Sequence, residues 1–196
     1  EKWSKGLQKG LRIYQGDTYD EERKQLHDQA INDIKIGKND KVTDMVRDIY
    51  NMDLTGQIIV SMPSLEDERF FKTVIYMCAH SSEGSMGIII NKKIDFDLYP
   101  DLLEQLGIDK PLYNKKLFIR YGGPIESGRG FVLHSDDIIQ KESLNIQKGI
   151  ALTSTTEFFD DLAIGKGPKN SILALGYAGW GPGQLENEII QNSWIT

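Results

Sequence analysis

The sequence has little cysteine, no net positive charge and no long apolar segments, and each shortage excludes a class of protein. Cys78 is its one cysteine, so no disulfide can form within the chain, and no cysteine and histidine cluster has zinc-finger spacing. The apolar runs are shorter than the roughly 18 residues that a membrane helix needs, and the first residues lack the layout of a secretion signal. We therefore expect a soluble protein of a reducing compartment, the cytoplasm, with no membrane association.

The overall charge gives the chain no general attraction to nucleic acid. The formal net charge is -6 at pH 7, so binding to phosphate backbones would need a local basic patch. The length of 196 residues and the hydrophobic content of 39% suit one globular domain with an appendage.

Residues 1–51 differ in character from the rest of the chain. They contain ten basic and ten acidic residues and no motif, and they predict a charged helical extension with helices at about 17–34 and 41–50. The basic and apolar residues near the start are compatible with a membrane-surface or nucleic-acid helix, but a solvated helix packed on the domain is the preferred interpretation. Residues 52–196 form the predicted domain, and Met52 could be a native start.

The stretch 73–91 (TVIYMCAHSSEGSMGIIIN) predicts two strands folded back on each other, with Gly84 and Gly87 in the turn. A period of two places Cys78 and His80 on one face of the first strand. An imidazole next to a thiol stabilises the thiolate, so this pair could form a nucleophile or a redox-sensitive sulfur. The preferred interpretation is that Cys78 is an inert core residue and His80 a hydrogen-bonding one.

Short strands and short helices alternate along the rest of the domain, which predicts an α+β fold. Strands are expected at 56–62, 117–121, 131–134, 138–146, 149–153 and 171–177. Helices are expected at 97–106 and 184–193, and a third, short helix is expected to begin at a capping box formed by Ser154 and Glu157. His134 ends one of these strands and is a second candidate histidine.

Glycine-rich segments supply the other candidate sites. Residues 176–183 could present backbone N–H groups to an anion, although their spacing is neither a Walker A nor a Rossmann motif, and tight packing is the alternative. Trp180 is then either a core residue or a stacking surface. Arg129 lies in 127–130 (SGRG), a predicted flexible hairpin tip, where it could contact an anionic ligand or simply be solvated. Glu186 and Glu188 are interpreted as a solvated helix face, and no metal site is predicted.

Three segments, 62–92 (MPSLEDERFFKTVIYMCAHSSEGSMGIIINK), 121–134 (YGGPIESGRGFVLH) and 174–194 (ALGYAGWGPGQLENEIIQNSW), resemble the bacterial AlgH/YqgE family of uncharacterised proteins. The resemblance spans about residues 54–196. It implies an α+β domain whose bifurcated, mainly antiparallel sheet forms a pseudo-barrel with flanking short helices. It also implies a C-terminal helical segment that this sequence lacks after Thr196, whereas residues 1–51 have no counterpart.

The resemblance also implies a set of signature positions: Cys78, His80, Gly84, Gly87, Asn91, Gly122, Gly123, Pro124, Arg129, Gly130, His134, Trp180, Gly181, Gln184 and Glu186. Cys78, His80 and His134 are the catalytic candidates. The others, apart from Pro124, Gly130 and Glu186, are the predicted ligand-binding residues.

The motifs carry no complete catalytic layout, and the family has no settled enzymatic activity. We therefore expect a monomeric, non-enzymatic regulatory protein that uses no cofactor and binds a small ligand or a protein partner. The alternatives are a thiol-dependent enzyme or redox sensor using Cys78 with His80, and a transcriptional regulator, as the family name suggests. Direct DNA binding is not expected, because the sequence contains no DNA-reading motif.

Overall fold

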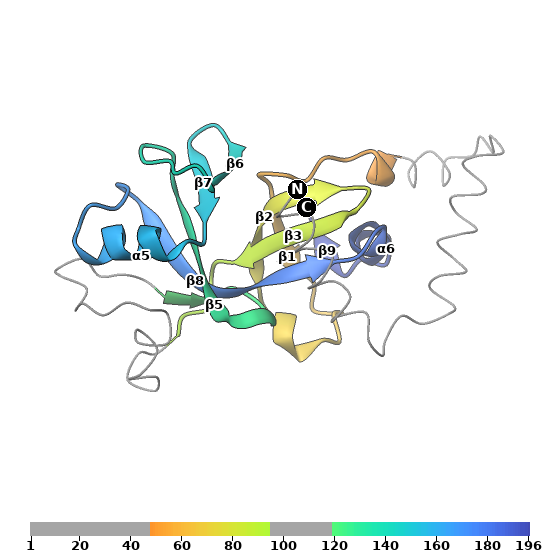
Figure 1. Cartoon of the computed structure of the whole chain (residues 1–196). Coiled ribbons are helices and arrows are strands. Elements are labelled where there is room, and N and C mark those ends of the chain that lie inside the picture. The colour runs from red at the N-terminus through yellow and green to blue at the C-terminus, as the bar shows by residue number, and fades with distance from the viewer. Residues whose placement is uncertain (1–47, 95–118) are drawn as a thin grey trace.

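The computed structural model describes residues 48–94 and 119–196, and within them a mixed sheet of nine strands forms the centre of the fold (Figure 1). The strand order is β6-β7-β5-β8-β3-β2-β1-β9, with β4 paired to β8. All described pairings are antiparallel except that of β4 with β8. The described residues therefore have an α+β fold. The predicted helices at 17–34 and 97–106 lie outside them.

The predicted hairpin at 73–91 is confirmed as β2 (Val74–Ser81) and β3 (Gly84–Ile89), and β1 (Ile58–Ser61) pairs with the outer edge of β2. Gly84 follows the turn with φ +129°. Gly87, however, lies inside β3 opposite Met77 and not in the turn. This position favours glycine because a Cβ there would lie 2.5 Å from the Ile75 side chain.

The register of β2 against β3 shifts between Met77 and Ala79. Met77 is opposite Gly87, whereas Ala79 is opposite Met86, so β2 contains one more residue than β3 over this stretch. This is a β-bulge, and it changes which face the following side chains occupy. Ile75 and Met77 pack on one face of the sheet, whereas Cys78 and Ala79 both pack on the other.

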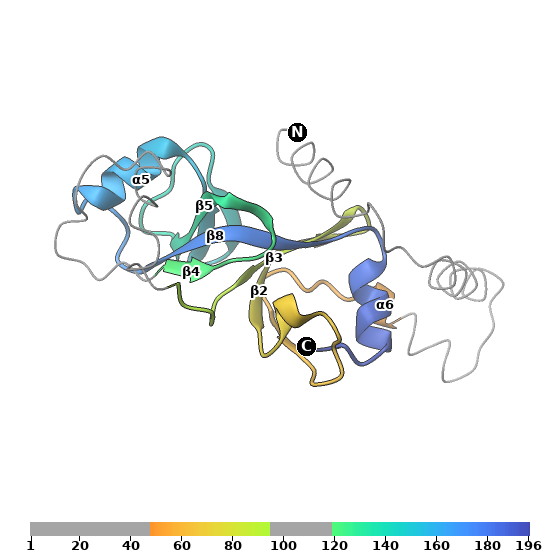
Figure 2. The same ribbon diagram turned by 90° about the horizontal axis from the view of Figure 1, so that it is seen from below.

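Strand β8 (Ser171–Trp180) connects the two halves of the molecule (Figures 1 and 2). Its first part pairs with β5 (Ile125–Ser135) and with β4 (Ile119–Tyr121), and its last part pairs with β3. Two glycine-rich predictions are wrong here. Residues 127–130 lie within β5 and not at a hairpin tip, and residues 176–180 of the loop predicted at 176–183 belong to β8. Residues 178–180 pair with β3, whereas residues 126–129 have no partner in β8 and form an irregularity between Ile125 and Gly130.

The remaining elements of the β4–β7 half are β6 (Leu144–Gln147), β7 (Ile150–Thr153) and α5 (Thr156–Ala163). The strand predicted at 138–146 begins only at Leu144, since the residues before it form a turn. Helix α5 is capped by Thr155 and not by Ser154, because the Thr155 hydroxyl accepts a hydrogen bond from the Phe158 N–H. The helix packs Phe158 and Phe159 against β4, β5 and β8.

At the other end of β8, the chain forms α6 (Gln184–Ile190) and β9 (Trp194–Ile195). Figure 2 shows α5 and α6 at opposite ends of this strand. The predicted helix at 184–193 is confirmed only as far as Ile190, since Trp194 belongs to β9, which pairs with β1. Helix α6 covers the sheet face that carries Ile75 and Met77, and buries Leu185 there. A short 3-10 helix, η1 (Glu68–Phe70), adds Phe70 to this core.

None of the helices in residues 48–94 and 119–196 is both long and apolar enough to cross a membrane.

Candidate functional site

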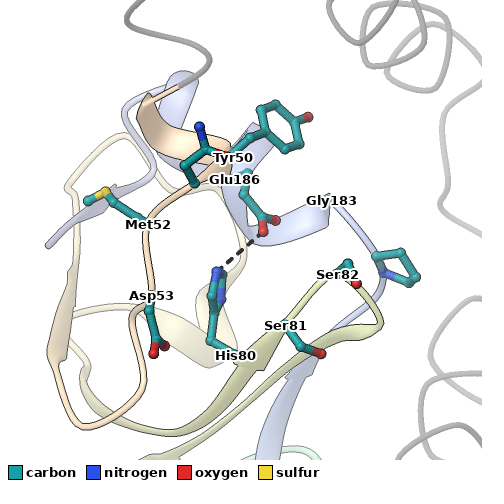
Figure 3. A pocket seen from close by; sticks show the side chains of 10 residues that line it. Tyr50, Met52, Asp53, His80, Ser81, Ser82, Gly183 and Glu186 are labelled. Carbon is teal, nitrogen blue, oxygen red and sulfur yellow. Dashed lines mark ion pairs between the residues drawn. The ribbon is translucent and has the colours of Figure 1, made fainter.

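His80 lies at the end of β2 between a serine and a buried carboxylate. Its Nδ1 is 2.9 Å from Ser85 Oγ on β3, and its Nε2 is 3.5 Å from Glu186 Oε1 on α6. The side chains of His80 and Glu186 are only 5% and 7% exposed. Figure 3 shows the two side chains pointing toward one another from the hairpin and the helix. The pair therefore connects two elements that are far apart in the sequence.

A cavity of about 410 Å³ lies beside this pair (Figure 3). Its volume falls in the lower part of the range of small-molecule sites. Asn51, Ser82 and Pro182 on its rim are exposed, so the cavity opens to solvent. The lining comes from the segment before β1, the β2–β3 turn and the start of α6: Tyr50, Asn51, Met52, Asp53, His80, Ser81, Ser82, Pro182, Gly183 and Glu186.

The lining is acidic. Among residues 48–94 and 119–196, it contains two carboxylates, Asp53 and Glu186, and no lysine or arginine. The Thr55 backbone N–H donates a hydrogen bond of 2.9 Å to Asp53 Oδ1, and this bond is the largest cause that lowers the pKa of Asp53. Asp53 therefore remains negatively charged well into the acidic range. The cavity accordingly disfavours anions.

Ser85, His80 and Glu186 together have the composition of a hydrolase triad, but the serine is inaccessible. Ser85 is 1% exposed, and it does not line the cavity. A nucleophile must reach the substrate within a few ångströms. The arrangement instead fixes the imidazole: Ser85 and Glu186 hold its two nitrogens and orient His80 against the cavity wall.

Cys78 and His80 do not share a face of β2, so the prediction that they lie on one face is wrong. The bulge at Cys78 moves His80 onto the α6 side, while the thiol is buried among Tyr76, Met86 and Ile88 on the opposite side. Cys78 is 1% exposed, and burial strongly raises the pKa of its thiol. A protonated, inaccessible thiol is a poor nucleophile.

His134 lies in the other half of the molecule, in β5, and is not part of the cavity. Its Nδ1 is 2.9 Å from the Ser135 carbonyl oxygen, so Nδ1 carries the proton, and its Nε2 accepts from the Thr153 hydroxyl at 2.8 Å. Thr153 in turn accepts from Ser143 at 2.6 Å. Desolvation, with the ring 4.5 Å from that of Phe158, lowers the pKa of His134. The histidine is thus a neutral, fully hydrogen-bonded core residue.

Gly122 and Gly123 pack against the backbone of β8. A Cβ on Gly122 would lie 2.2 Å from the Gly176 carbonyl oxygen, and a Cβ on Gly123 would lie 2.0 Å from the Tyr177 carbonyl carbon. These positions have no room for a side chain, and no room for a ligand against the same face. Close backbone packing accounts for both glycines.

Trp180, Gly181 and Gln184 belong to a hydrogen-bond network around Glu188. The Glu188 carboxylate accepts from the indole N–H groups of Trp180 at 2.9 Å and of Trp194 at 2.7 Å, and from Gln184 Nε2 at 2.9 Å. Gln184 Oε1 accepts from the Gly181 N–H at 2.9 Å. Trp180 is 2% exposed, which makes it a core residue. The interpretation of Glu186 and Glu188 as a solvated face is therefore wrong.

The other two predicted ligand-binding side chains have partners within the protein. Asn91 accepts from the Val74 N–H at 2.9 Å and donates to the Lys72 carbonyl at 2.8 Å, which fixes the start of β2. Arg129 is half exposed and donates to Glu126 and Ser154, each at 2.9 Å. Neither residue lines the cavity.

Comparison with known proteins assigns the chain to a family. Residues 58–196 match the family model described as AlgH-like (DUF179). The chain belongs to the AlgH-like family. A UPF0301 protein of Rhodopseudomonas palustris strain BisB18 is 52% identical over 150 residues, covering 72% of this chain and 70% of that protein. A UPF0301 protein of Rhodospirillum rubrum is 46% identical over 143 residues, covering 73% and 74%.

Solved structures of related proteins agree with this assignment. The solution structure of the AlgH protein from Pseudomonas aeruginosa is 35% identical to this chain, with a TM-score of 0.64, and covers 74% of this chain and 77% of that chain. A crystal structure of protein DIP2367 from Corynebacterium diphtheriae, 22% identical with a TM-score of 0.55, covers 74% and 75% and supports the fold alone.

In this AlgH-like chain, two of the three signature segments meet at the cavity and the third does not. Segment 62–92 supplies His80, Ser81 and Ser82, and segment 174–194 supplies Pro182, Gly183 and Glu186. Residues 50–53, which contribute Asp53, were missed as part of a site, because no local motif marks them. In residues 48–94 and 119–196, no three histidine, cysteine, aspartate or glutamate side chains are grouped to hold a metal ion.

Proposed function

We propose that this AlgH-like chain is a non-enzymatic regulatory protein that binds a small ligand in the cavity between the β2–β3 turn and α6. The observation that carries the proposal is the Glu186 carboxylate, buried at the wall of an open cavity with His80 as its partner. Burying a carboxylate costs free energy unless it is fully hydrogen-bonded. A ligand that bonds to Glu186 would offset that cost.

The burial of the nucleophile candidates supports a binding role over catalysis. Cys78 and Ser85 are each 1% exposed, so neither the thiol-dependent alternative nor a serine-based one has an accessible attacking atom. The transcriptional alternative gains no support from the cavity, whose lining has two carboxylates and, in the part of the chain that the structure describes, no lysine or arginine.

The sequence and the family resemblance support the assembly state, the compartment and the domain bounds. We propose a monomer in the bacterial cytoplasm, where a lone, buried cysteine suits a reducing environment. We also propose that residues 52–196 form the family domain, with its sheet closed into a pseudo-barrel, and that residues 1–51 form a helical extension.

A fragment screen on the ¹⁵N-labelled 196-residue chain tests the proposal. Small polar fragments that bind the cavity are expected to shift the amide signals of Ser81, Ser82 and Gly183 in a saturable way. Ser82→Tyr should block binding by filling the cavity, whereas Glu83→Tyr, at the next exposed turn position outside the lining, should not. A screen in which no fragment shifts these amides, or in which both variants behave alike, would overturn the proposal.

A further inference from the structure

The partners of Glu186 are incomplete within the protein. Among residues 48–94 and 119–196, its side chain has one polar contact, the His80 Nε2 at 3.5 Å from Oε1. A carboxylate has about four lone-pair sites for hydrogen bonds. The neighbouring Glu188 shows how this chain satisfies a carboxylate when the role is structural, with three donors within 3 Å. Glu186 therefore has capacity to accept further hydrogen bonds at the cavity wall.

The surroundings of Glu186 favour a cationic donor. Asp53 adds a second negative charge to the lining, and His80 provides at most one positive charge when it is protonated. Ser81 and Ser82 add hydroxyl oxygens that can accept hydrogen bonds. Charge-assisted hydrogen bonds to a carboxylate are about twice as strong as neutral ones. An ammonium group would supply both the donors and the compensating charge.

The lining also fits an organic cation better than a bare metal ion. Met52, Tyr50 and Pro182 place apolar atoms around the cavity, and its volume of about 410 Å³ exceeds what a single ion needs. Asp53, His80 and Glu186 do not form a group suited to a metal ion in the part of the chain that the structure describes. A carbon skeleton could therefore contact the apolar atoms while its charged end reaches Glu186.

From these observations we infer that the cavity binds a protonated amine, with its ammonium group donating to the Glu186 carboxylate. This inference rests on the proposed function, because it names the ligand class of the same cavity. It assigns Glu186 as the residue that selects for positive charge, and His80 as the residue that positions the Glu186 carboxylate.

Three probes of equal chain length, n-butylammonium chloride, 1-butanol and sodium butyrate, test the inference on the full chain. Titrations followed by the amide signals of Ser81, Ser82 and Gly183 should give a dissociation constant for butylammonium about 10-fold or more below that for butanol. Butyrate should give no saturable shift. Raising sodium chloride should weaken the binding of butylammonium and leave that of butanol unchanged, because salt screens charge.

Glu186→Gln should remove the preference, raising the dissociation constant of butylammonium to that of butanol. Glu83→Gln makes the same change of charge at an exposed turn position outside the lining and should preserve the preference. The salt comparison uses the unmodified chain, so it tests whether the cavity prefers a positive charge even if Glu186→Gln does not fold.

The possible failures of the two proposals are distinct. Equal binding of the three probes, or tighter binding of butyrate, would overturn the amine inference and leave the ligand-binding function in place. The same holds if none of the three binds but a neutral fragment from the screen does. The absence of any cavity shift in both experiments would overturn the proposed function together with the inference.

Discussion

Cys78 and His80, two residues apart in β2, lie on opposite faces of the sheet because a β-bulge separates them. Without the bulge, their even spacing would place both on one face. The extra residue reverses the alternation of side chains. Cys78 and Ala79 therefore pack in the core on one face of the sheet, and His80 contacts α6 on the other face. The thiol and the imidazole therefore have separate roles, and each can be tested alone.

Cys78 should be unreactive in the folded protein. Burial raises the pKa of its thiol and blocks access, so alkylation by iodoacetamide at pH 8 should be slower by several orders of magnitude than in guanidinium chloride. Mass spectrometry of timed samples gives both rates, with the unfolded chain as the control. Rapid alkylation of the native protein would revive the hypothesis of a reactive thiol.

Glu188→Gln should destabilise the protein by about 2 kcal/mol, because a donor group replaces one of the two oxygens that accept from Trp180, Trp194 and Gln184. Urea unfolding measures the change in free energy. Glu157→Gln makes the same substitution at an exposed position of α5 and should cost no more than about 0.5 kcal/mol. Equal effects would show that the network adds little.

Gly176→Ala should destabilise by roughly 3 kcal/mol or more. Gly176 has φ +71°, and a Cβ there would lie 2.4 Å from the Gly123 carbonyl oxygen and 2.7 Å from that of Ile125. Gly128→Ala, where a Cβ would meet nothing within 4 Å, is the matched control and should change stability by less than about 1 kcal/mol. Thermal or urea unfolding of both variants provides the comparison.

His134 should make the folded state less stable as the pH falls below about 6.5. Desolvation lowers the pKa of His134 in the folded state, so the unfolded chain binds the proton first as the pH falls. The loss begins at the unfolded pKa and is complete below the folded one. The imidazole signals in NMR should titrate below the normal histidine pKa, and His134→Gln should flatten this part of the stability profile. A normal or raised pKa would contradict the assignment.

Several features could be predicted from the sequence because they depend on local rules. The alternation of apolar residues identified the β2–β3 hairpin and the strands at β1 and β7, and the spacing around Leu185 and Ile189 identified α6. Predictions based on glycine were less accurate. Glycines at 128, 130, 176 and 179 suggested loops but lie in strands, because their place in the sheet depends on distant partners.

The candidate site shows the same division. His80, Gly183 and Glu186 lie in segments that drew attention as motifs, but no motif indicated that Asp53 would approach from before β1. The period of α6 placed Glu186 beside buried Leu185, which is the one signal that could have questioned its assignment to a solvated face. Its contact with His80 joins two residues that are far apart in the sequence, so no local pattern could reveal it.

The sequence by itself determined the composition, the strand and helix pattern and the family to which the chain belongs, because these depend on local residue types and their spacing. The tertiary structure decided which polar residues meet. A single bulged residue turned His80 away from Cys78, and the path of β8 brought α6 over His80 to create the cavity with Glu186. Such contacts depend on register and packing between distant segments, which local patterns do not specify.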